Sequence, residues 1–311
     1  AMSRSIPVGC WLVVALGFGA GVASGQVTAE RIDAGVRIQL AGQPFAEYRI
    51  DVNGTPAVWP IIGPTGKPMT RAFPMAEQEG ERKDHPHHRS LWFNHGSVNG
   101  QCFWMRNPIK HREFVEVSGG SVAVVVTRND WVLTDGTKVC EDERRLVFGG
   151  DADRRWIDFD VTVRASEGPL TFGDTKEGSF GIRVAETIKV DAKLGGRIVN
   201  SEGQEDAAAW GKRAAWVDYS GPVDGQRVGI AVFNHPASFR FPTYWHVRTY
   251  GLFAANPFGV HDFTGGKEPD GAHTVPAGES IRLIYRVLLH RGDDKEGRVA
   301  EAFKALAAEK K

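Results

Sequence analysis

The chain has 311 residues, with 38 basic and 38 acidic side chains and a formal net charge of zero. Proteins that bind nucleic acid or an anionic membrane usually have an excess of basic residues. This chain has no such excess, so we expect neither as a partner. After the N-terminal segment no apolar run approaches the roughly 20 residues that cross a bilayer, and we expect no integral membrane association.

The first residues have the pattern of a secretory signal peptide. Arg4 precedes an apolar run from Trp11 to Val22, and small residues follow at Ala23 and Gly25. We predict cleavage after Gly25, which places the product in the periplasm or outside the cell. For the remaining chain, residues 26–311, we predict a single domain.

Apolar and polar residues alternate along many segments, as is typical of half-buried β-strands. In residues 157–164 the apolar set on one face is Ile157, Phe159, Val161 and Val163. Further strands are predicted at 36–40, 45–52, 122–133, 228–233 and 281–289, with glycine-containing turns between strands. The predicted fold class is mainly β: a large antiparallel β-sandwich.

One helix is predicted at the C-terminal end of the chain. Its apolar face consists of Val299, Ala302, Phe303, Leu306 and Ala307. Asp293 or Asp294 is the expected cap, because an aspartate side chain accepts hydrogen bonds from the first backbone amides of a helix. We expect this helix to cover an edge or a face of a sheet.

Three long segments are rich in Pro, Gly, His and Trp, and they are residues 60–112, 171–184 and 234–266. We predict them to be loops on the sheet scaffold, where binding and catalytic residues usually lie. Cys102 lies in the first segment, and Cys140 is the other cysteine after the predicted cleavage site. In an oxidising compartment they either form one disulfide or remain as free thiols.

The first segment contains His85, His87, His88 and His95 within eleven positions. On an extended chain His85 and His87 face one side, as two imidazoles that bind one metal must, while His88 faces away. One interpretation is therefore a divalent metal at His85 and His87. The others are substrate binding or acid–base chemistry, and hydrogen-bonded structural histidines.

The second segment carries charged residues among small ones, in the order Asp174, Lys176, Glu177 and Arg183. If this segment is partly buried, Glu177 beside Lys176 is a candidate general acid or base, because burial and a neighbouring charge shift a carboxyl pKa. The alternative is a solvated turn with an ordinary ion pair.

The third segment combines aromatic rings with polar side chains. Trp245, Tyr250 and Phe253 are candidate faces for a sugar ring, and the groups that would reach its hydroxyls or a carboxylate are His246, Arg248 and Asn256. If residues 244–253 are extended, His246, Arg248 and Tyr250 share one face. Core packing is the alternative for the aromatic residues, and we prefer it for Phe253.

Together these segments resemble a secreted family labelled "methane oxygenase PmoA", whose activity is largely unknown. The matching stretches are PIIGPTG at 60–66, DHPHHRSLWFNHGSVNGQCFW at 84–104, GDTKEGSFGIR at 173–183 and YWHVRTYGLFAANPFG at 244–259. The membrane methane monooxygenase subunit spans the bilayer several times, and this chain has no such helix, so the sequence does not support the label itself.

A second, weaker resemblance is to aldose 1-epimerase, or galactose mutarotase-like, proteins. It depends on Asn234-His235-Pro236, followed by Phe239 and Pro242, and on PAGE at 276–279. The resemblance implies a β-supersandwich, a fold whose members act on sugars through paired histidine and carboxylate groups.

The predicted function is a secreted carbohydrate-active enzyme that uses His/Glu acid–base chemistry on a sugar or glycoside, with cleavage favoured over epimerisation or elimination. The predicted catalytic residues are His85, His87, His88, Glu177 and His246. The predicted substrate contacts are Asp84, Trp92, Asn94, Asn99, Trp104, Lys176, Arg183, Trp245, Arg248, Tyr250 and Asn256. The alternative hypothesis is a noncatalytic glycan-binding protein, and the third is a metal-dependent oxidase. The clustered titratable groups favour the carbohydrate-active enzyme over the binding protein.

Overall fold

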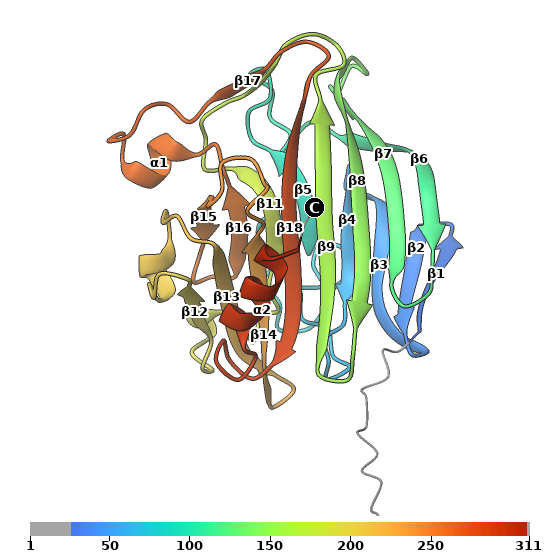
Figure 1. Cartoon of the computed structure of the whole chain (residues 1–311), viewed down its shortest axis with the longest axis vertical. Coiled ribbons are helices and arrows are strands. Elements are labelled where there is room, and N and C mark those ends of the chain that lie inside the picture. The colour runs from blue at the N-terminus through green and yellow to red at the C-terminus, as the bar shows by residue number, and fades with distance from the viewer. Residues whose placement is uncertain (1–25, 310–311) are drawn as a thin grey trace, which may run out of the picture.

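The computed structural model describes residues 26–309, so the predicted signal peptide lies outside the described residues. Two eight-stranded antiparallel sheets pack against each other (Figure 1). In Figure 1, strands of the second sheet lie nearer the viewer than those of the first sheet. The predicted fold class, a large antiparallel β-sandwich with a C-terminal helix, is confirmed.

The first sheet joins the N-terminal strands to strands from the middle and the end of the chain. Its order is β1 (Val27–Ile32), β2 (Gly35–Leu40), β3 (Gln43–Val52), β4 (Thr55–Ile61), β5 (Leu91–His95), β11 (Gly178–Arg183), β16 (Leu252–Asn256) and β15 (Tyr244–Val247). Every neighbouring pair in it is antiparallel.

The second sheet contains the longest strands. Its order is β12 (Arg197–Asn200), β13 (Trp216–Val223), β14 (Gln226–Asn234), β18 (Ser280–Arg291), β9 (Arg154–Arg164), β8 (Lys138–Gly150), β7 (Ala123–Val132) and β6 (Ile109–Ser118). The remaining elements are the pair β10 (Leu170–Phe172) and β17 (His273–Val275), the helices α1 (Val260–Thr264) and α2 (Val299–Ala307), and the 3-10 turns η1 (Val190–Ala192) and η2 (Asp206–Ala209).

Strand β9 shows how the alternating sequence builds the sandwich. Its residues alternate between buried and half-buried positions, as the period-two pattern predicts. Phe159 on the inner face packs on Phe180 of β11, with ring centroids 5.1 Å apart, and Phe180 stacks on Tyr285 of β18 at 4.5 Å. The outward Asp160 pairs with Arg282 of β18. The core therefore lies between the two sheets.

Helix α2 covers the outer face of the second sheet, as predicted. Its buried Val299 and Leu306 pack with Trp216, Phe233 and Leu288. The predicted cap is wrong, because the N-cap residue is Arg298, with φ of 51° and no side-chain cap bond. Asp293 instead accepts the backbone amides of Lys295 and Glu296, and so it stabilises the turn before the helix.

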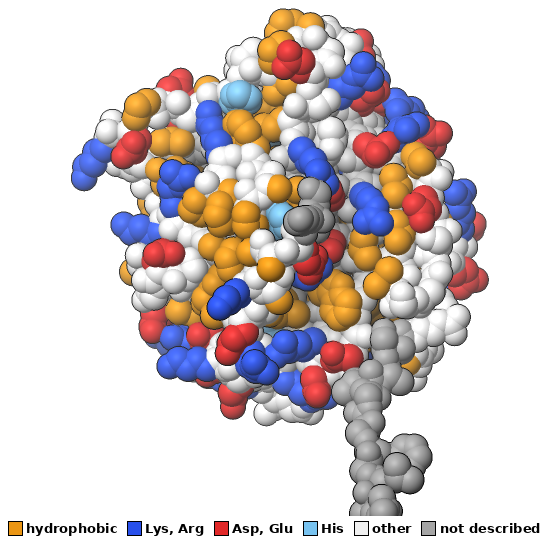
Figure 2. Space-filling model, viewed as in Figure 1, with side chains coloured by type: hydrophobic (Ala, Val, Ile, Leu, Met, Phe, Trp, Pro, Cys, Tyr) orange, Lys and Arg blue, Asp and Glu red, His pale blue; other side chains and the backbone are white. Residues whose placement is uncertain are grey.

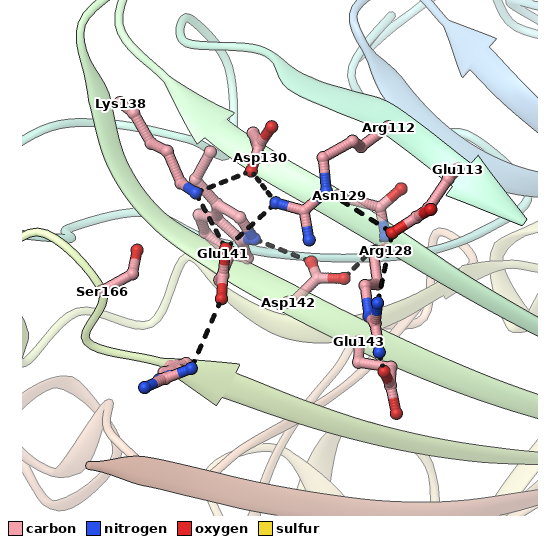
Figure 3. Close-up of polar contacts among 12 residues, drawn as sticks. Arg112, Glu113, Arg128, Asn129, Asp130, Lys138, Glu141, Asp142, Glu143 and Ser166 are labelled. Carbon is pink, nitrogen blue, oxygen red and sulfur yellow. Dashed lines mark hydrogen bonds and ion pairs between the residues drawn. The ribbon is translucent and has the colours of Figure 1, made fainter. Parts of the chain in front are cut away.

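The outer face of the second sheet near β6 to β9 is covered by paired charges. Lys138 and Arg112 both contact the carboxylates of Asp130 and Glu141, at 2.8 to 3.0 Å (Figure 3). Figure 2 shows basic and acidic side chains interspersed over this part of the surface. These charges neutralise one another across the strands, as is typical of a solvated sheet face.

The prediction that three long segments are loops is wrong in part, because they contain the strands β5, β11, β15 and β16. All residues of β5, β11 and β16 are buried. Strands that are buried on both faces lack the alternation that marks a half-buried strand, so the pattern does not reveal them. These strands carry the motif residues into the centre of the first sheet.

Candidate functional site

The motif segments meet on the outer face of the first sheet. Strand β5 pairs with β11, β11 with β16 and β16 with β15. The outward side chains of these strands and of the turns beside them therefore share one surface. This arrangement brings most of the predicted site residues together.

Four aromatic rings form a column on this face, which we call the histidine stack: Tyr250, His85, His88 and Trp92. Successive ring centroids lie 5.5, 4.7 and 5.3 Å apart, with interplanar angles of 8°, 10° and 18°. The segment is not extended but forms a turn, in which the His88 amide donates to the His85 carbonyl. This turn, with His85 at φ 46°, places His88 on His85 instead of facing away.

His87 lies at the edge of the histidine stack. Its ring is 4.6 Å from that of His88 and 6.2 Å from that of Trp104. Burial, with smaller effects from His85 and Arg89, lowers the pKa of His87 to about 4. Burial lowers the pKa of His88 further still. Both imidazoles are therefore neutral at neutral pH.

Two arginines form ion pairs with the carboxylate of Asp84. Arg183 donates to Asp84 Oδ1 at 3.0 Å, and Arg71 donates to the same oxygen. Both guanidinium groups are buried, and Arg183 also contacts His88 Nδ1 at 3.0 Å. Burial raises the pKa of Asp84, but Arg183 and Arg71 outweigh it and keep the pKa below its usual value. Asp84 is thus a fixed anion at neutral pH.

The second oxygen of the Asp84 carboxylate lies beside the solvent-exposed imidazole of His85. Asp84 Oδ2 lies 3.2 Å from His85 Nδ1, and the His85 side chain is 41% exposed. A carboxylate at this distance favours the tautomer with the proton on Nδ1, which leaves the lone pair on Nε2. Asp84 and His85 therefore form a dyad whose free nitrogen is available for proton transfer.

The second half of the site is the loop before β11. Lys176 Nζ lies 3.7 Å from Glu177 Oε1, and both side chains are partly exposed. Asn256 donates to the Thr175 carbonyl at 2.8 Å, and Asp262 accepts the Lys176 amide at 2.9 Å. The loop that presents Glu177 is thus held at several backbone positions.

His246 lies beneath this loop rather than on the open surface. It is 3% exposed, and its Nδ1 donates to the Lys176 carbonyl at 2.9 Å. Burial lowers the pKa of His246 to about 4, and the hydrogen bond to Lys176 opposes this shift only in part. His246 is a neutral donor that fixes the backbone next to Glu177.

Tyr250 connects the two halves of the site. Burial raises its pKa, Arg183 and Arg248 oppose the change, and the carboxylates of Glu177 and Asp84 add to it. Both carboxylates therefore act on one phenol. A shared face for His246, Arg248 and Tyr250 required residues 244–253 to be extended. They instead form a hairpin of β15 and β16, with Arg248 and Tyr250 in its turn.

A groove of about 280 Å³ adjoins Tyr250. It is lined by Ala207, Trp210, Val247, Arg248, Thr249 and Tyr250. The Arg248 guanidinium carbon is 5.7 Å from the Trp210 ring and 5.8 Å from the Tyr250 ring. The groove thus offers two aromatic rings and one cation beside the Asp84–His85 dyad.

Several predicted substrate contacts are not on the open surface. Trp245 is fully buried in the core between the sheets, and its Nε1 donates to the Ala214 carbonyl, so it offers no face to a sugar. Trp92 and Trp104 are also fully buried and lie against the histidines rather than forming an open platform. They support the histidine stack.

The predicted asparagine contacts have structural partners instead. Asn94 is fully buried and donates to the Phe103 carbonyl. Asn99 lies in an exposed turn and binds the backbone of Pro169 and Thr171, which ties that turn to β10. Asn256 is buried; it donates a hydrogen bond to the carbonyl of residue 175 and accepts hydrogen bonds from the amides of residues 258 and 259. A sugar hydroxyl would have to displace these bonds.

Two residues of the site were not predicted. Arg71 is a partner of Asp84 that lies 13 residues earlier in the chain, in a stretch without a motif. Trp210 follows the 3-10 turn η2 and has no pattern that connects it to Arg248. Only the folding of the chain brings these residues to the site. In the sequence, an Arg or Trp without an evident structural role is only a weak indication of a site residue.

The predicted metal site has few candidate ligands. Within residues 26–309 no group of three or more His, Cys, Asp or Glu side chains is arranged to hold a metal ion. His85 already directs Nδ1 at Asp84. A divalent metal at His85 and His87 stays a prediction. Cys102 and Cys140 are free thiols, and no helix of residues 26–309 is long and apolar enough to span a membrane.

Fold and site together define an antiparallel β-sandwich protein with a cluster of histidines and arginines on the outer face of one sheet. The chain belongs to the Family of unknown function (DUF6807), whose model matches residues 35–304. This description names no activity, and the resemblance to the group labelled "methane oxygenase PmoA" stays a prediction. A search of curated proteins finds no match.

The solved structures to which the chain is similar include galactose mutarotase-like proteins and a glycosidase. A galactose mutarotase-like protein from Clostridium acetobutylicum has 10% identity and a TM-score of 0.44, over 86% of this chain and 99% of that one. One from Lactobacillus casei has 11% identity and a TM-score of 0.35, over 85% and 100%. The GH36 α-galactosidase AgaB from Geobacillus stearothermophilus has 9% identity and a TM-score of 0.44, over 86% of this chain and 40% of that one.

Proposed function

We propose that this chain is an exported carbohydrate-active enzyme whose acid–base groups are His85, oriented by Asp84, and Glu177. The observation that carries the proposal is the Asp84–His85 dyad, in which two buried arginines fix the carboxylate and the imidazole is left exposed. A passive binding surface needs no such fixed pair, whereas proton transfer depends on it.

In glycoside cleavage one group takes the proton of the attacking water while a second protonates the leaving oxygen. His85 accepts the proton on Nε2, and Asp84 stabilises the imidazolium that forms. Asp84 itself stays ionised, because Arg183 and Arg71 keep its pKa low. Glu177, whose carboxylate raises the pKa of Tyr250, is the second group. The glycosidic bond breaks with the addition of one water molecule.

The other predicted catalytic histidines are positioning residues in this proposal. His88 lies between His85 and Trp92 and fixes the plane of the His85 ring. His87 packs edge-on to both His85 and His88. His246 holds the backbone beside Glu177. Because these imidazoles stay neutral, they keep their hydrogen-bond pattern while His85 changes its charge.

The test is turnover of plant and algal glycan fragments by the His85→Gln and Glu177→Gln variants. Each should lower kcat by about a hundredfold or more, the loss typical of a missing general acid or base. His246→Ala should lower activity by a comparable factor, because the loop that presents Glu177 loses its support. Folding is checked by the thermal unfolding midpoint.

His111→Gln is the matched control, because His111 lies on β6 at the far edge of the opposite sheet. It should retain the activity of the unaltered protein. If the His85 and Glu177 variants are folded and fully active, their proposed roles are wrong.

A noncatalytic glycan-binding protein is the second candidate, and the groove between Trp210 and Tyr250 favours it. Trp245 cannot test this alternative, since it lies in the core, so Trp210→Ala replaces it. If no glycan fragment is turned over and Trp210→Ala lowers glycan affinity, binding is the function.

A further inference from the structure

We propose that the ligand of this site is an acidic sugar, a uronic acid residue, and that Arg248 binds its carboxylate. The inference rests on the proposed function, because it names the substrate class of the same site. It depends on the surroundings of Arg248, which differ from those of every other cation in the site.

The other cations of the site have anionic partners. Arg71 and Arg183 share the carboxylate of Asp84, and Lys176 lies beside Glu177. The four cations, with Arg248 included, therefore face two carboxylates. In the described part of the chain, Arg248 is the one of these four cations that no carboxylate contacts. A cation without a carboxylate partner in a groove attracts anionic ligands.

Arg248 is an exposed cation whose contacts are with aromatic rings. Within residues 26–309 no acidic side chain forms an ion pair with it, and its side chain has no hydrogen-bond partner. Trp210 and Tyr250 lie 5.7 and 5.8 Å from its guanidinium carbon. Contacts with aromatic rings restrict a guanidinium without consuming its N–H donors. The donors of Arg248 are therefore preorganised and free.

A carboxylate is the anion that best matches this arrangement. The planar guanidinium fork binds a carboxylate through two parallel hydrogen bonds. The groove of about 280 Å³ is slightly smaller than the sites of drug-sized ligands, which are about 300 Å³ or more, so it suits one ring unit of a glycan. Trp210 and Tyr250 supply ring faces for the apolar side of that unit. Together these features fit a pyranose ring that carries a carboxylate.

The experiment compares uronate trisaccharides derived from pectin and alginate with their carboxyl-reduced forms, which are neutral and otherwise identical. Binding is measured by calorimetry and turnover by product formation, with the unaltered protein and the Arg248→Gln and His85→Gln variants. Arg145→Gln is the matched control, because Arg145 is an exposed arginine on β8 of the opposite sheet. A sulfated neutral trisaccharide tests whether any anion suffices.

The unaltered protein should bind at least one uronate trisaccharide about tenfold or more tightly than its reduced form. Arg248→Gln should remove this difference and leave the affinity for the reduced form unchanged, whereas Arg145→Gln should change neither. Equal binding of the acidic and reduced forms, or an Arg248→Gln variant with unchanged affinity, overturns the inference. Equal binding of the sulfated sugar overturns the choice of a carboxylate.

The His85→Gln variant separates this inference from the proposed function. If neutral sugars are turned over, with turnover dependent on His85 and not on Arg248, the enzyme proposal stands and the acidic ligand is wrong. If uronates bind through Arg248 without turnover, the ligand class stands and the enzyme proposal fails. If no trisaccharide binds or reacts, both are wrong.

Discussion

Asp84 is the residue on which the site depends most, because it joins three positive or polar partners through two oxygens. Arg71 and Arg183 contact Oδ1, and His85 contacts Oδ2. A carboxylate in this position sets the tautomer of His85 and stabilises its protonated form. The contribution of Asp84 to catalysis can therefore be tested separately from its contribution to the stability of the fold.

Asp84→Asn tests this separation. The amide keeps an acceptor oxygen for the arginines but removes the charge that stabilises the His85 imidazolium. We expect kcat to fall by about a hundredfold or more. A folded Asp84→Asn variant that keeps the kcat of the unaltered protein would contradict this role of Asp84.

Gly181 is required for the packing beneath the histidine stack. A Cβ at this position would lie 2.6 Å from Cζ2 of the Trp92 indole. Trp92 is fully buried and supports His88, so it has little room to move. The backbone of β11 must therefore pass close under the ring.

Gly181→Ala should destabilise the fold by about 1–3 kcal/mol, the usual cost of overpacking. It should also reduce activity at temperatures where the protein stays folded, because the histidine stack is displaced. Gly136→Ala is a poor control, since Gly136 has φ of 92°. Ala165→Gly, at a buried position near β9, tests instead whether any small-residue change has this effect on activity.

At the scale of elements, the site depends on strands buried on both faces. One face of β5, β11 and β16 contributes to the core between the sheets, and the other face, which carries Trp92, packs with Trp104. Both faces of these strands are therefore constrained, which gives the site a rigid base. A rigid base suits catalysis, because small displacements of acid–base groups lower the rate strongly.

Helix α2 gives a test of packing on the opposite sheet. Leu306→Ala should destabilise the fold by about 2–5 kcal/mol, because Leu306 is fully buried against the sheet. Lys304→Ala on the exposed side of the same helix should change stability by less than about 0.5 kcal/mol. Urea denaturation measures both, and equal effects would show that the helix is not docked.

For the whole molecule, buried histidines make folding depend on pH. Burial lowers the pKa of His95 to about 4, and the pKa of His246 is also lowered to about 4, from an ordinary value of 6.5. Between these values the unfolded chain binds more protons than the folded one, so stability falls as the pH drops from 6.5 towards 4. Each group contributes up to about 1.4 kcal/mol per pH unit.

Thermal unfolding should therefore show a midpoint that decreases steadily from pH 6.5 to pH 4. His95→Gln should make this decrease shallower, because its amide retains hydrogen-bonding capacity next to Ser179 and Gly173 without titrating. An unchanged slope would mean that His95 does not contribute.

A second buried histidine has the opposite effect. His290 directs Nε2 at Asp218, 2.8 Å away, and Nδ1 at the Arg291 carbonyl, 3.0 Å away. Burial opposes the charge on His290, but Asp218 and the carbonyl outweigh it and raise the pKa of His290. Because both nitrogens face acceptors, the folded protein holds the imidazolium.

A raised pKa gives stability that is present below the ordinary value of 6.5 and is lost as the pH rises through the folded value. The unfolding midpoint should thus also decrease above neutral pH, and His290→Gln should remove this alkaline decrease while it lowers stability at neutral pH. An alkaline decrease that persists in the variant would assign it to other groups.

The class of fold was predictable from the sequence, because the periodic pattern that buries one face of a strand or helix is a local property of each segment. β9 was predicted from its alternation and the C-terminal helix from its helical spacing of apolar residues. The sequence also marked the segments that form the site, since His, Trp and Arg are concentrated there. Their pairing as β5, β11 and β16 was not predictable, because both faces are buried and no alternation remains.

Which of these residues are exposed to a ligand depends on the folded arrangement of the chain. Trp245 and Asn256 lie in the same motif as Arg248, yet the first two are buried and the last is exposed. His85 and His88 differ in the same way, because a turn with positive φ stacks one ring on the other. Exposure and ionisation depend on neighbours far along the chain, such as Arg71 and Arg183, and these neighbours are brought together only by folding.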